Sequence, residues 1–225
     1  MAAKITVLLV DDHPMVREGL RAMLSGAPGI DVVGEASSGE EALQKVMEVG
    51  PSVVLMDIRM PGMGGTEAVR QVKKVRPATA VIMVTMYESE MYVVEAIRAG
   101  AAGYLTKDAS REQLCNAIRA VMGGGTLMRS GLLRQAVEGL FPTAGGSQER
   151  EGMSGASRLS AREREVLGFL ARGYGNRAIC GELHLAEITV KKHVQNVMSK
   201  LGVSDRTNAA IVGVRLGFAE QAAFP

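Results

Sequence analysis

The chain has 225 residues, and its 47% hydrophobic and 22% charged residues are typical of globular protein, not of disordered or fibrous chains. Its apolar runs are shorter than the roughly 20 residues that cross a bilayer, the N-terminus lacks signal-peptide features, and two lone cysteines offer no disulfide framework. We therefore expect one full domain and one smaller domain, located in the cytoplasm and without a membrane partner.

The net charge of +2 is unevenly distributed along the chain. Residues 1–122 carry 13 basic and 15 acidic residues, a net charge of −2, whereas residues 123–225 carry 13 and 9, a net charge of +4. The basic excess in the C-terminal part is expected if that part contacts a polyanion, although ordinary solvated surfaces reach the same value.

Short apolar runs rich in β-branched residues alternate with segments of helical period in residues 1–122. The predicted strands are Ile5–Val10, Asp31–Ala36, Ser52–Asp57, Ala80–Thr85 and Ala102–Leu105. Alternation of this kind predicts right-handed βαβ units on a parallel sheet. The expected fold class is therefore α/β, with a doubly wound sheet of five parallel strands.

The second half of the chain changes character after residue 122. Glycine and serine are frequent in residues 123–157, which predicts a flexible linker, and within it only Gly131–Leu140 has the pattern of a short helix. From residue 158 to residue 225 the apolar residues recur three and four positions apart, without alternating segments. We expect a small all-α domain there.

Acidic residues follow two strands that are neighbours in a doubly wound sheet. Asp11 and Asp12 come directly after the first strand, and Asp57 ends the third. Their carboxylates would converge at the crevice where such sheets bind ligands, and crowded carboxylates with room for water suit Mg²⁺. Taken singly, each acid could equally well solvate a turn.

Two further residues favour a shared site. Thr85 ends the fourth strand, and Lys107, a flexible point charge suited to a phosphoryl oxygen, follows the fifth. All five residues would lie at the carboxyl edge of one sheet, an arrangement that chance rarely produces.

Residues 4–122 resemble the receiver domain of bacterial two-component response regulators, a flavodoxin-like fold. The resemblance is carried by the motifs VDDHP, MDIRMPGMGG and GYLTKD together with Thr85. It implies that a histidine kinase phosphorylates Asp57. It also implies an Mg²⁺ site formed by the carboxylates of Asp11, Asp12 and Asp57 and the backbone carbonyl of Arg59.

The resemblance implies roles for three more residues. Lys107 would contact the phosphoryl group, Thr85 would move toward it as the switch, and Tyr104 would follow that movement. An aspartyl carboxylate is a suitable phosphoryl acceptor, and the transfer needs mainly positioning and neutralisation of charge.

The sequence of the all-α domain predicts two helices joined by a short turn. The first covers Asn176–Leu183 and the second Glu187–Leu201, in which a stripe of apolar residues is expected to be buried: Val190, Val194, Val197 and Leu201. Lys191, Lys192 and Gln195 fall off this stripe, where they could contact phosphates and base edges in the major groove. In isolation a lysine pair of this kind is more often part of a solvated face.

The segment from Leu159 to about Gly217 resembles the LuxR-type helix-turn-helix of the NarL/FixJ group of response regulators, through REREVL, TVKKHV, KLGV and DR. The resemblance implies that Lys191, Lys192 and Gln195 contact bases. Contacts at or near the DNA backbone would come from Thr189, His193, Asn176, Arg177, Lys200 and Arg206. Phosphorylation would release the DNA-binding domain, promote a homodimer that binds two half-sites, or both, and would thereby regulate transcription.

Both helices lack the usual capping residues. Gly175 and Ala186 stand where a Ser or Thr cap is common, and Gly181 lies inside the first helix. The missing cap at Ala186 and the glycine at Gly181 each cost about 1 kcal/mol. We therefore expect a helix-turn-helix of modest intrinsic stability.

Two other functions are compatible with parts of the sequence. An aspartyl phosphatase or phosphotransferase would carry a DxD arrangement after its first strand, whereas this chain has adjacent aspartates, so we do not expect an enzyme acting on an outside substrate. A receiver controlled by a ligand or partner instead of phosphate is the second alternative. A zinc site is not expected, because the histidines and cysteines show no ligand spacing.

Overall fold

The structure, a computed structural model, describes residues 4–86, 90–124, 157–203 and 205–219. The chain divides into two compact units, residues 1–122 and residues 123–225, each of which is described by itself. The linker predicted for residues 123–157, with its short helix at Gly131–Leu140, lies almost entirely outside the described residues. None of the helices in the described ranges combines the length and hydropathy that spanning a membrane would require.

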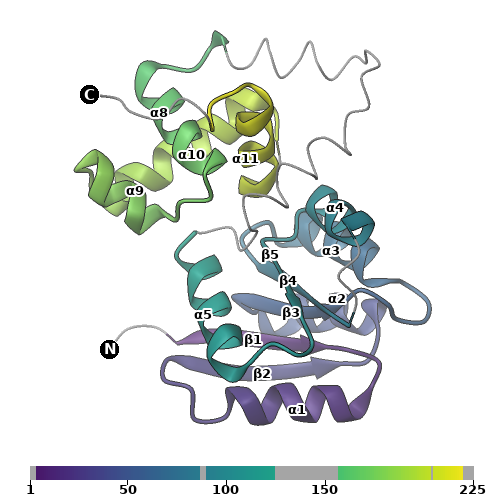
Figure 1. Ribbon diagram of the computed structural model, residues 1–225. Helices are drawn as coiled ribbons and strands as arrows, with labels where there is room; N and C mark the ends of the chain where they lie inside the picture. Colours follow the sequence, from purple (N-terminus) through teal and green to yellow (C-terminus); the bar gives the residue numbers. More distant parts are fainter. Residues whose placement is uncertain (1–3, 87–89, 125–156, 204, 220–225) are drawn as a thin grey trace. The chain divides into compact units, whose positions relative to one another are not determined.

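The first unit is built on five parallel strands in the order β2-β1-β3-β4-β5 (Figure 1). The strands are β1 (Ile5–Val10), β2 (Ile30–Ala36), β3 (Val53–Asp57), β4 (Ala80–Thr85) and β5 (Gly103–Thr106). The predicted α/β fold is confirmed, and each predicted strand matches its bounds to within one residue. This order makes β1 and β3 neighbours, so their carboxyl ends open at the same edge.

Helices cover both faces of this sheet. They are α1 (Pro14–Leu24), α2 (Gly39–Val49), α3 (Gly65–Val75), α4 (Glu90–Ala99) and α5 (Arg111–Met122). Helix α1 packs beside α5 on one face, whereas α2, α3 and α4 follow one another on the other (Figure 1). Every residue of β3 is buried as a result, which explains why this strand reads as a continuous apolar run ending in an acid.

The second unit contains four described helices: α8 (Ala161–Ala171), α9 (Asn176–Leu183), α10 (Glu187–Leu201) and α11 (Arg206–Arg215). The predicted bounds of α9 and α10 are confirmed. The predicted stripe of α10 is buried in a core that it shares with α8, α9 and α11, including Val166, Leu167, Leu170, Ile179 and Ala209. Burying one face of each short helix stabilises helices that would be marginal alone.

Two helices of the second unit, α9 and α10, begin without a side-chain cap. Neither Gly175 before α9 nor Ala186 before α10 provides a side-chain cap, as predicted. Helix α9 ends at His184 in the left-handed conformation, with φ of 52°. Among the described residues this is the one non-glycine residue with positive φ, a conformation that costs about 1–2 kcal/mol outside glycine. The turn between α9 and α10 is therefore a weak point of the unit.

Candidate functional site

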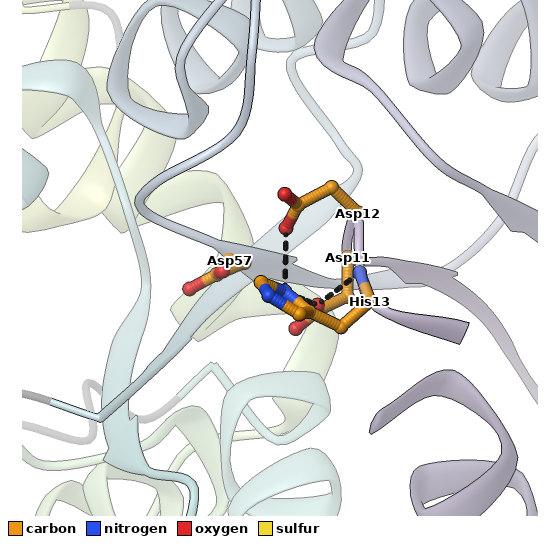
Figure 2. A group of neighbouring side chains, drawn as sticks. All are labelled: Asp11, Asp12, His13 and Asp57. Atoms are coloured by element: carbon orange, nitrogen blue, oxygen red, sulfur yellow. Dashed lines mark hydrogen bonds and ion pairs between the residues drawn. The ribbon is translucent and has the colours of Figure 1, made fainter. Parts of the chain in front are cut away.

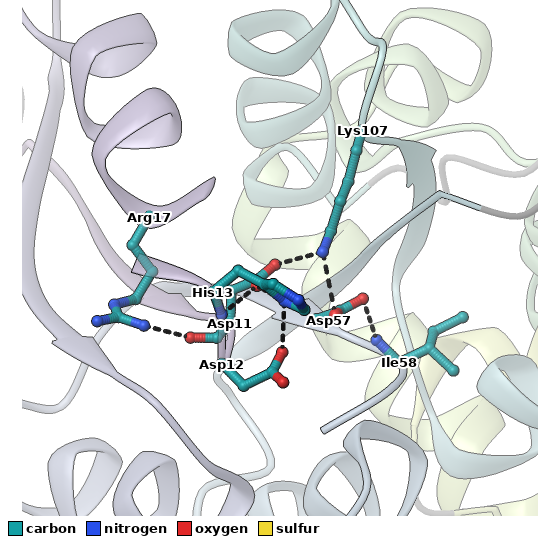
Figure 3. Close-up of polar contacts among 7 residues, drawn as sticks. All are labelled: Asp11, Asp12, His13, Arg17, Asp57, Ile58 and Lys107. Atoms are coloured by element: carbon teal, nitrogen blue, oxygen red, sulfur yellow. Dashed lines mark hydrogen bonds and ion pairs between the residues drawn. The ribbon is translucent and has the colours of Figure 1, made fainter. Parts of the chain in front are cut away.

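A lysine and two buried aspartates meet at the carboxyl edge of the sheet (Figure 3). Asp11 follows β1, Asp57 ends β3, and Lys107 follows β5. The Nζ atom of Lys107 lies 2.6 Å from Oδ2 of Asp11 and 3.0 Å from Oδ2 of Asp57. The two aspartates are only 1% and 6% exposed. One ammonium group thus bridges carboxylates from two adjacent strands.

The backbone around the aspartates is held in place from both sides. The Nη1 group of Arg17 donates to the carbonyl oxygen of Asp11 at 2.6 Å, and the amide of Ile58 donates to Oδ1 of Asp57 at 2.8 Å (Figure 3). A Cβ atom on Gly65 would lie 1.9 Å from the carbonyl oxygen of Asp57. Glycine at this position therefore lets α3 begin directly against the backbone of Asp57.

The electrostatics of the cluster oppose full ionisation of Asp57. Burial raises the pKa of Asp57 above its ordinary value, and the charge of Asp11 raises it further, although Lys107 acts in the opposite direction. Burial acts to lower the pKa of Lys107, but the two carboxylates hold it above its ordinary value. The fold therefore disfavours ionised Asp57 relative to a solvent-exposed aspartate, and the positive charge of Lys107 offsets part of that cost.

Asp12 and His13 complete a group that could hold a metal ion (Figure 2). One ligand atom from each of Asp11, Asp12, His13 and Asp57 lies within 4.8 Å of the others. Oδ1 of Asp12 is buried and receives no hydrogen bond from the described residues; Nδ1 of His13 lies 2.9 Å away, and this contact is an ion pair only when the imidazole is protonated. Three carboxylates, one with a buried unsatisfied oxygen, suit a hard divalent cation such as Mg²⁺.

Sequence reasoning did not find His13. It considered His13 only together with the cysteines, as part of a zinc site, whereas His13 lies beside the acidic cluster. The signal was its position in VDDHP, directly after two predicted metal ligands.

Millimolar Mg²⁺ is expected to raise the unfolding temperature of the full chain, because a ligand that binds only the native state stabilises it. The variant Asp12→Asn should lose most of this rise, whereas Asp31→Asn, at an exposed aspartate paired with Lys4, should keep it. Scanning calorimetry with and without Mg²⁺ measures both. The rise should shrink as the pH falls, because protonated carboxylates bind cations poorly. An equal rise in both variants would contradict a site at Asp12.

The residues with predicted switching roles lie on β4 and β5. Thr85 ends β4 and is 3% exposed, and its carbonyl oxygen accepts a hydrogen bond from the amide of Lys107 at 2.7 Å. Tyr104 on β5 is partly buried against the core of the unit. Arg59 donates through Nη2 to the hydroxyl of Tyr92 and lies over its ring, with the guanidinium carbon 5.3 Å from the centroid. Arg59 therefore connects the loop after β3 to α4.

The second unit presents a basic face on α10. The side chains of Lys191, Lys192 and Gln195 are exposed, opposite the buried stripe. Lys191 forms an exposed ion pair with Glu187 at 2.9 Å, a contact worth well under 1 kcal/mol that an anion could replace. Arg177 on α9 is also exposed.

Thr189 and His193 lie at the border of this face. Both are half-buried. Nδ1 of His193 is buried without a hydrogen-bond partner in the part of the chain that the structure describes. The geometry leaves only part of each side chain available for a contact with DNA.

Three other predicted DNA contacts are engaged inside the unit. The Nζ atom of Lys200 donates to the buried carboxylate of Glu163 at 2.6 Å. Arg206 donates to Oδ1 of the buried Asn176 at 2.7 Å and also to the carbonyl of Tyr174, and burial lowers the pKa of Arg206 to about 10. The structure therefore does not bring Asn176, Lys200 and Arg206 to the basic face, because their polar groups are used in internal contacts.

Comparison with known proteins matches both units to families. Residues 7–119 match the response regulator receiver domain, and residues 157–212 match the bacterial regulatory proteins of the luxR family. The chain is 38% identical over 215 residues to the transcriptional regulatory protein LnrK of Bacillus subtilis, covering 95% of this chain and 98% of LnrK. It is 36% identical to the DNA-binding transcriptional activator DevR/DosR of Mycobacterium tuberculosis, covering 94% and 95%.

A solved structure extends this likeness to the fold. The response regulator ChrA, from a heme-sensing two-component system, superimposes with a TM-score of 0.51 and is 34% identical. The match covers 96% of this chain and 99% of ChrA.

Proposed function

Because the chain belongs to the two-component response regulators that join a receiver domain to a LuxR-type DNA-binding domain, we propose that phosphorylation of Asp57 controls its binding to DNA. This family consists of transcriptional regulators, which are not a class of enzymes. The observation that carries the proposal is the bridge from Lys107 to Asp57 and Asp11 at 3.0 and 2.6 Å, beside the acidic metal cluster.

The geometry of this bridge supports phosphoryl transfer to Asp57. An Oδ atom of Asp57 forms a bond to phosphorus while the bond from phosphorus to the histidine nitrogen of the kinase breaks, and that nitrogen keeps the electron pair. Lys107 neutralises the oxygens of the transferred group and holds the carboxylate of Asp57 in position. Asp11, Asp12 and Asp57 would hold Mg²⁺ with the backbone carbonyl of Arg59, and the ion would supply further neutralisation of charge.

The new dianionic group then alters the surface of the receiver. Thr85 donates its hydroxyl to a phosphoryl oxygen, and Tyr104 follows because the movement of Thr85 opens space beside β5. The altered surface favours a homodimer whose two basic faces contact two half-sites on DNA. A protein that binds chromosomal DNA works in the cytoplasm, which is the location we propose. Its second partner is a histidine kinase.

Replacing Lys192 with Ala is expected to weaken DNA binding by about 1–3 kcal/mol and to reduce its dependence on salt. The measurement is fluorescence anisotropy with duplexes enriched from a random library, using full-length protein with acetyl phosphate and Mg²⁺. The matched control is Lys45→Ala on α2 of the receiver, a lysine paired with Glu48 at 3.0 Å, which should bind normally. If both variants lost affinity equally, α10 would not be the DNA-binding face.

A further inference from the structure

One large apolar side chain lies exposed near the start of α10. Ile188 is 77% exposed, and among the described residues of the second unit it is the large hydrophobic residue that remains uncovered. Fully burying an isoleucine contributes about 1.5–3 kcal/mol, and this unit leaves that contribution unused. Its position in α10, one turn before Lys191 and Lys192, needs an explanation beyond folding.

The helical period places Ile188 on the same face as the polar side chains that point outward. Residues three, four and seven positions apart share one side of a helix, and these are the intervals from Ile188 to Lys191, Lys192 and Gln195. At 3.6 residues per turn the four side chains span an arc of about 100°. All four are exposed, and the buried stripe of α10 lies on the opposite side. Ile188 is therefore the apolar member of a basic face.

We infer that Ile188 determines base specificity by packing against the C5-methyl group of a thymine in the major groove. The inference rests on the proposed DNA binding. The N-terminal residues of a recognition helix meet the base edges, and Ile188 is the second residue of α10. Thymine is the base that presents an apolar group in the major groove. The two lysines on either side of the arc provide the charge that draws this face to a polyanion.

The same charges argue against a protein as the occupant. The cores of protein interfaces are depleted in charged residues, lysine among them. Here two lysines lie within one turn of Ile188. A hydrophobic partner would have to desolvate both ammonium groups in order to cover one isoleucine.

The geometry also limits where the thymine lies. Ile188 and Lys192 are separated by about 6 Å along the helix axis, and successive bases of a strand by about 3.4 Å. The thymine should therefore lie within about two base pairs of the bases that Lys191 and Lys192 contact.

The test compares thymine with deoxyuridine, which lacks only the methyl group. Full-length protein with acetyl phosphate and Mg²⁺ first enriches duplexes from a random library, and each dT of the enriched half-site is then replaced by dU. At one position the wild type should bind about fourfold more weakly to dU, the expected effect of one buried methyl group. The variant Ile188→Ala should bind the dT duplex about tenfold more weakly and should no longer distinguish dT from dU.

Two controls distinguish a direct contact of Ile188 with thymine from a general effect of substitution or a loss of stability. Met47→Ala, at an exposed methionine of α2 in the receiver, should retain the wild-type preference for dT. Because Ile188 is exposed, Ile188→Ala should leave the unfolding temperature unchanged, which calorimetry checks.

Three results would overturn the inference. The first is an enriched half-site without thymine near the lysine-contacted bases. The second is a wild type that is insensitive to dU at every position, and the third is an Ile188→Ala variant that keeps the full preference for dT. In these three cases DNA binding itself remains intact, whereas the absence of any enriched duplex would refute the proposed function together with this inference.

Discussion

Replacing Asp57 with Ala is expected to abolish phosphorylation of the chain by acetyl phosphate. The dimerisation that acetyl phosphate induces in the wild type should be lost as well. The variant lacks the carboxylate oxygen that attacks phosphorus, and neither Asp11 nor Asp12 occupies the end of β3. Intact mass measurement after treatment with acetyl phosphate and Mg²⁺ reports the transferred group. Size-exclusion chromatography with light scattering reports the change from monomer to dimer. Wild type should show both, and Asp57→Ala should show neither.

The matched control for this experiment is Asp108→Ala. Asp108 is exposed and directly follows Lys107, so its loss removes one acidic side chain beside the site without removing the acceptor. This variant should be phosphorylated and should dimerise. A dimer shift that persists in Asp57→Ala would point to control by a ligand or partner instead of phosphate. Continuous release of phosphate from small phosphomonoesters would instead point to an enzyme.

Replacing Glu163 with Ala is expected to destabilise the DNA-binding unit by about 2–4 kcal/mol. Glu163 is 4% exposed, and its Oε2 atom accepts hydrogen bonds from Nζ of Lys200 at 2.6 Å and from the amide of Ser160 at 2.7 Å. The variant loses both the capping box of α8 and a charge-assisted contact between α8 and α10. In a unit with two uncapped helices, this loss removes a large share of the total stability.

Hydrogen–deuterium exchange on the full-length chain measures this effect separately in each unit. Amides of α8 and α10 should exchange faster in Glu163→Ala, while those of the receiver strands stay protected. In Glu163→Gln the exchange rates of α8 and α10 should lie between those of the wild type and of Glu163→Ala, because glutamine can still complete a capping box. Glu165→Ala, which breaks only a partly exposed pair with Arg162, should cost less than 1 kcal/mol. Equal losses in Glu163→Ala and Glu165→Ala would contradict the role of the Lys200 contact.

The stability contributed by Glu163 also depends on pH. Burial acts to raise the pKa of Glu163, but the Lys200 ammonium and the Ser160 amide hold it below its ordinary value of 4.5. A carboxyl group with a lowered pKa contributes its full stability above the ordinary value and loses it as the pH falls through the pKa of the folded state. The difference between wild type and Glu163→Gln should therefore disappear on acidification below pH 4.5.

The strands and the acidic edge of the sheet were predictable because their signals are local. A buried parallel strand is a continuous apolar run, and in this chain the runs of β1 and β3 each stop at an acid. Likewise, the buried stripe of α10 follows directly from helical period. The exact ends of a strand were less predictable: β5 begins and ends one residue later than predicted. Strand β5 is a four-residue edge strand that is only partly buried after Gly103, so neither a continuous apolar run nor a clear alternation marks its bounds.

The internal contacts of the DNA-binding unit were not predictable, because they join residues far apart in the chain. Lys200 meets Glu163 across 37 positions, and Arg206 meets Asn176 across 30. By sequence pattern alone, a basic side chain near the recognition helix is indistinguishable from a DNA contact. The one available signal was the spacing of Ser160 and Glu163, which is that of a capping box and therefore places Glu163 at a helix start.

The ion pairs of Lys107 with Asp11 and Asp57 have a consequence for the nascent chain. Lys107 and Asp57 lie 50 positions apart, and β5, which precedes Lys107, pairs only with β4. During translation Asp57 therefore leaves the ribosome long before its cationic partner is synthesised. Contacts of this separation form late, because the intervening chain must first be ordered. We therefore expect competence to accept a phosphoryl group to arise only after Lys107 has been made and the receiver has folded, so a chain that ends before Lys107 could not be activated.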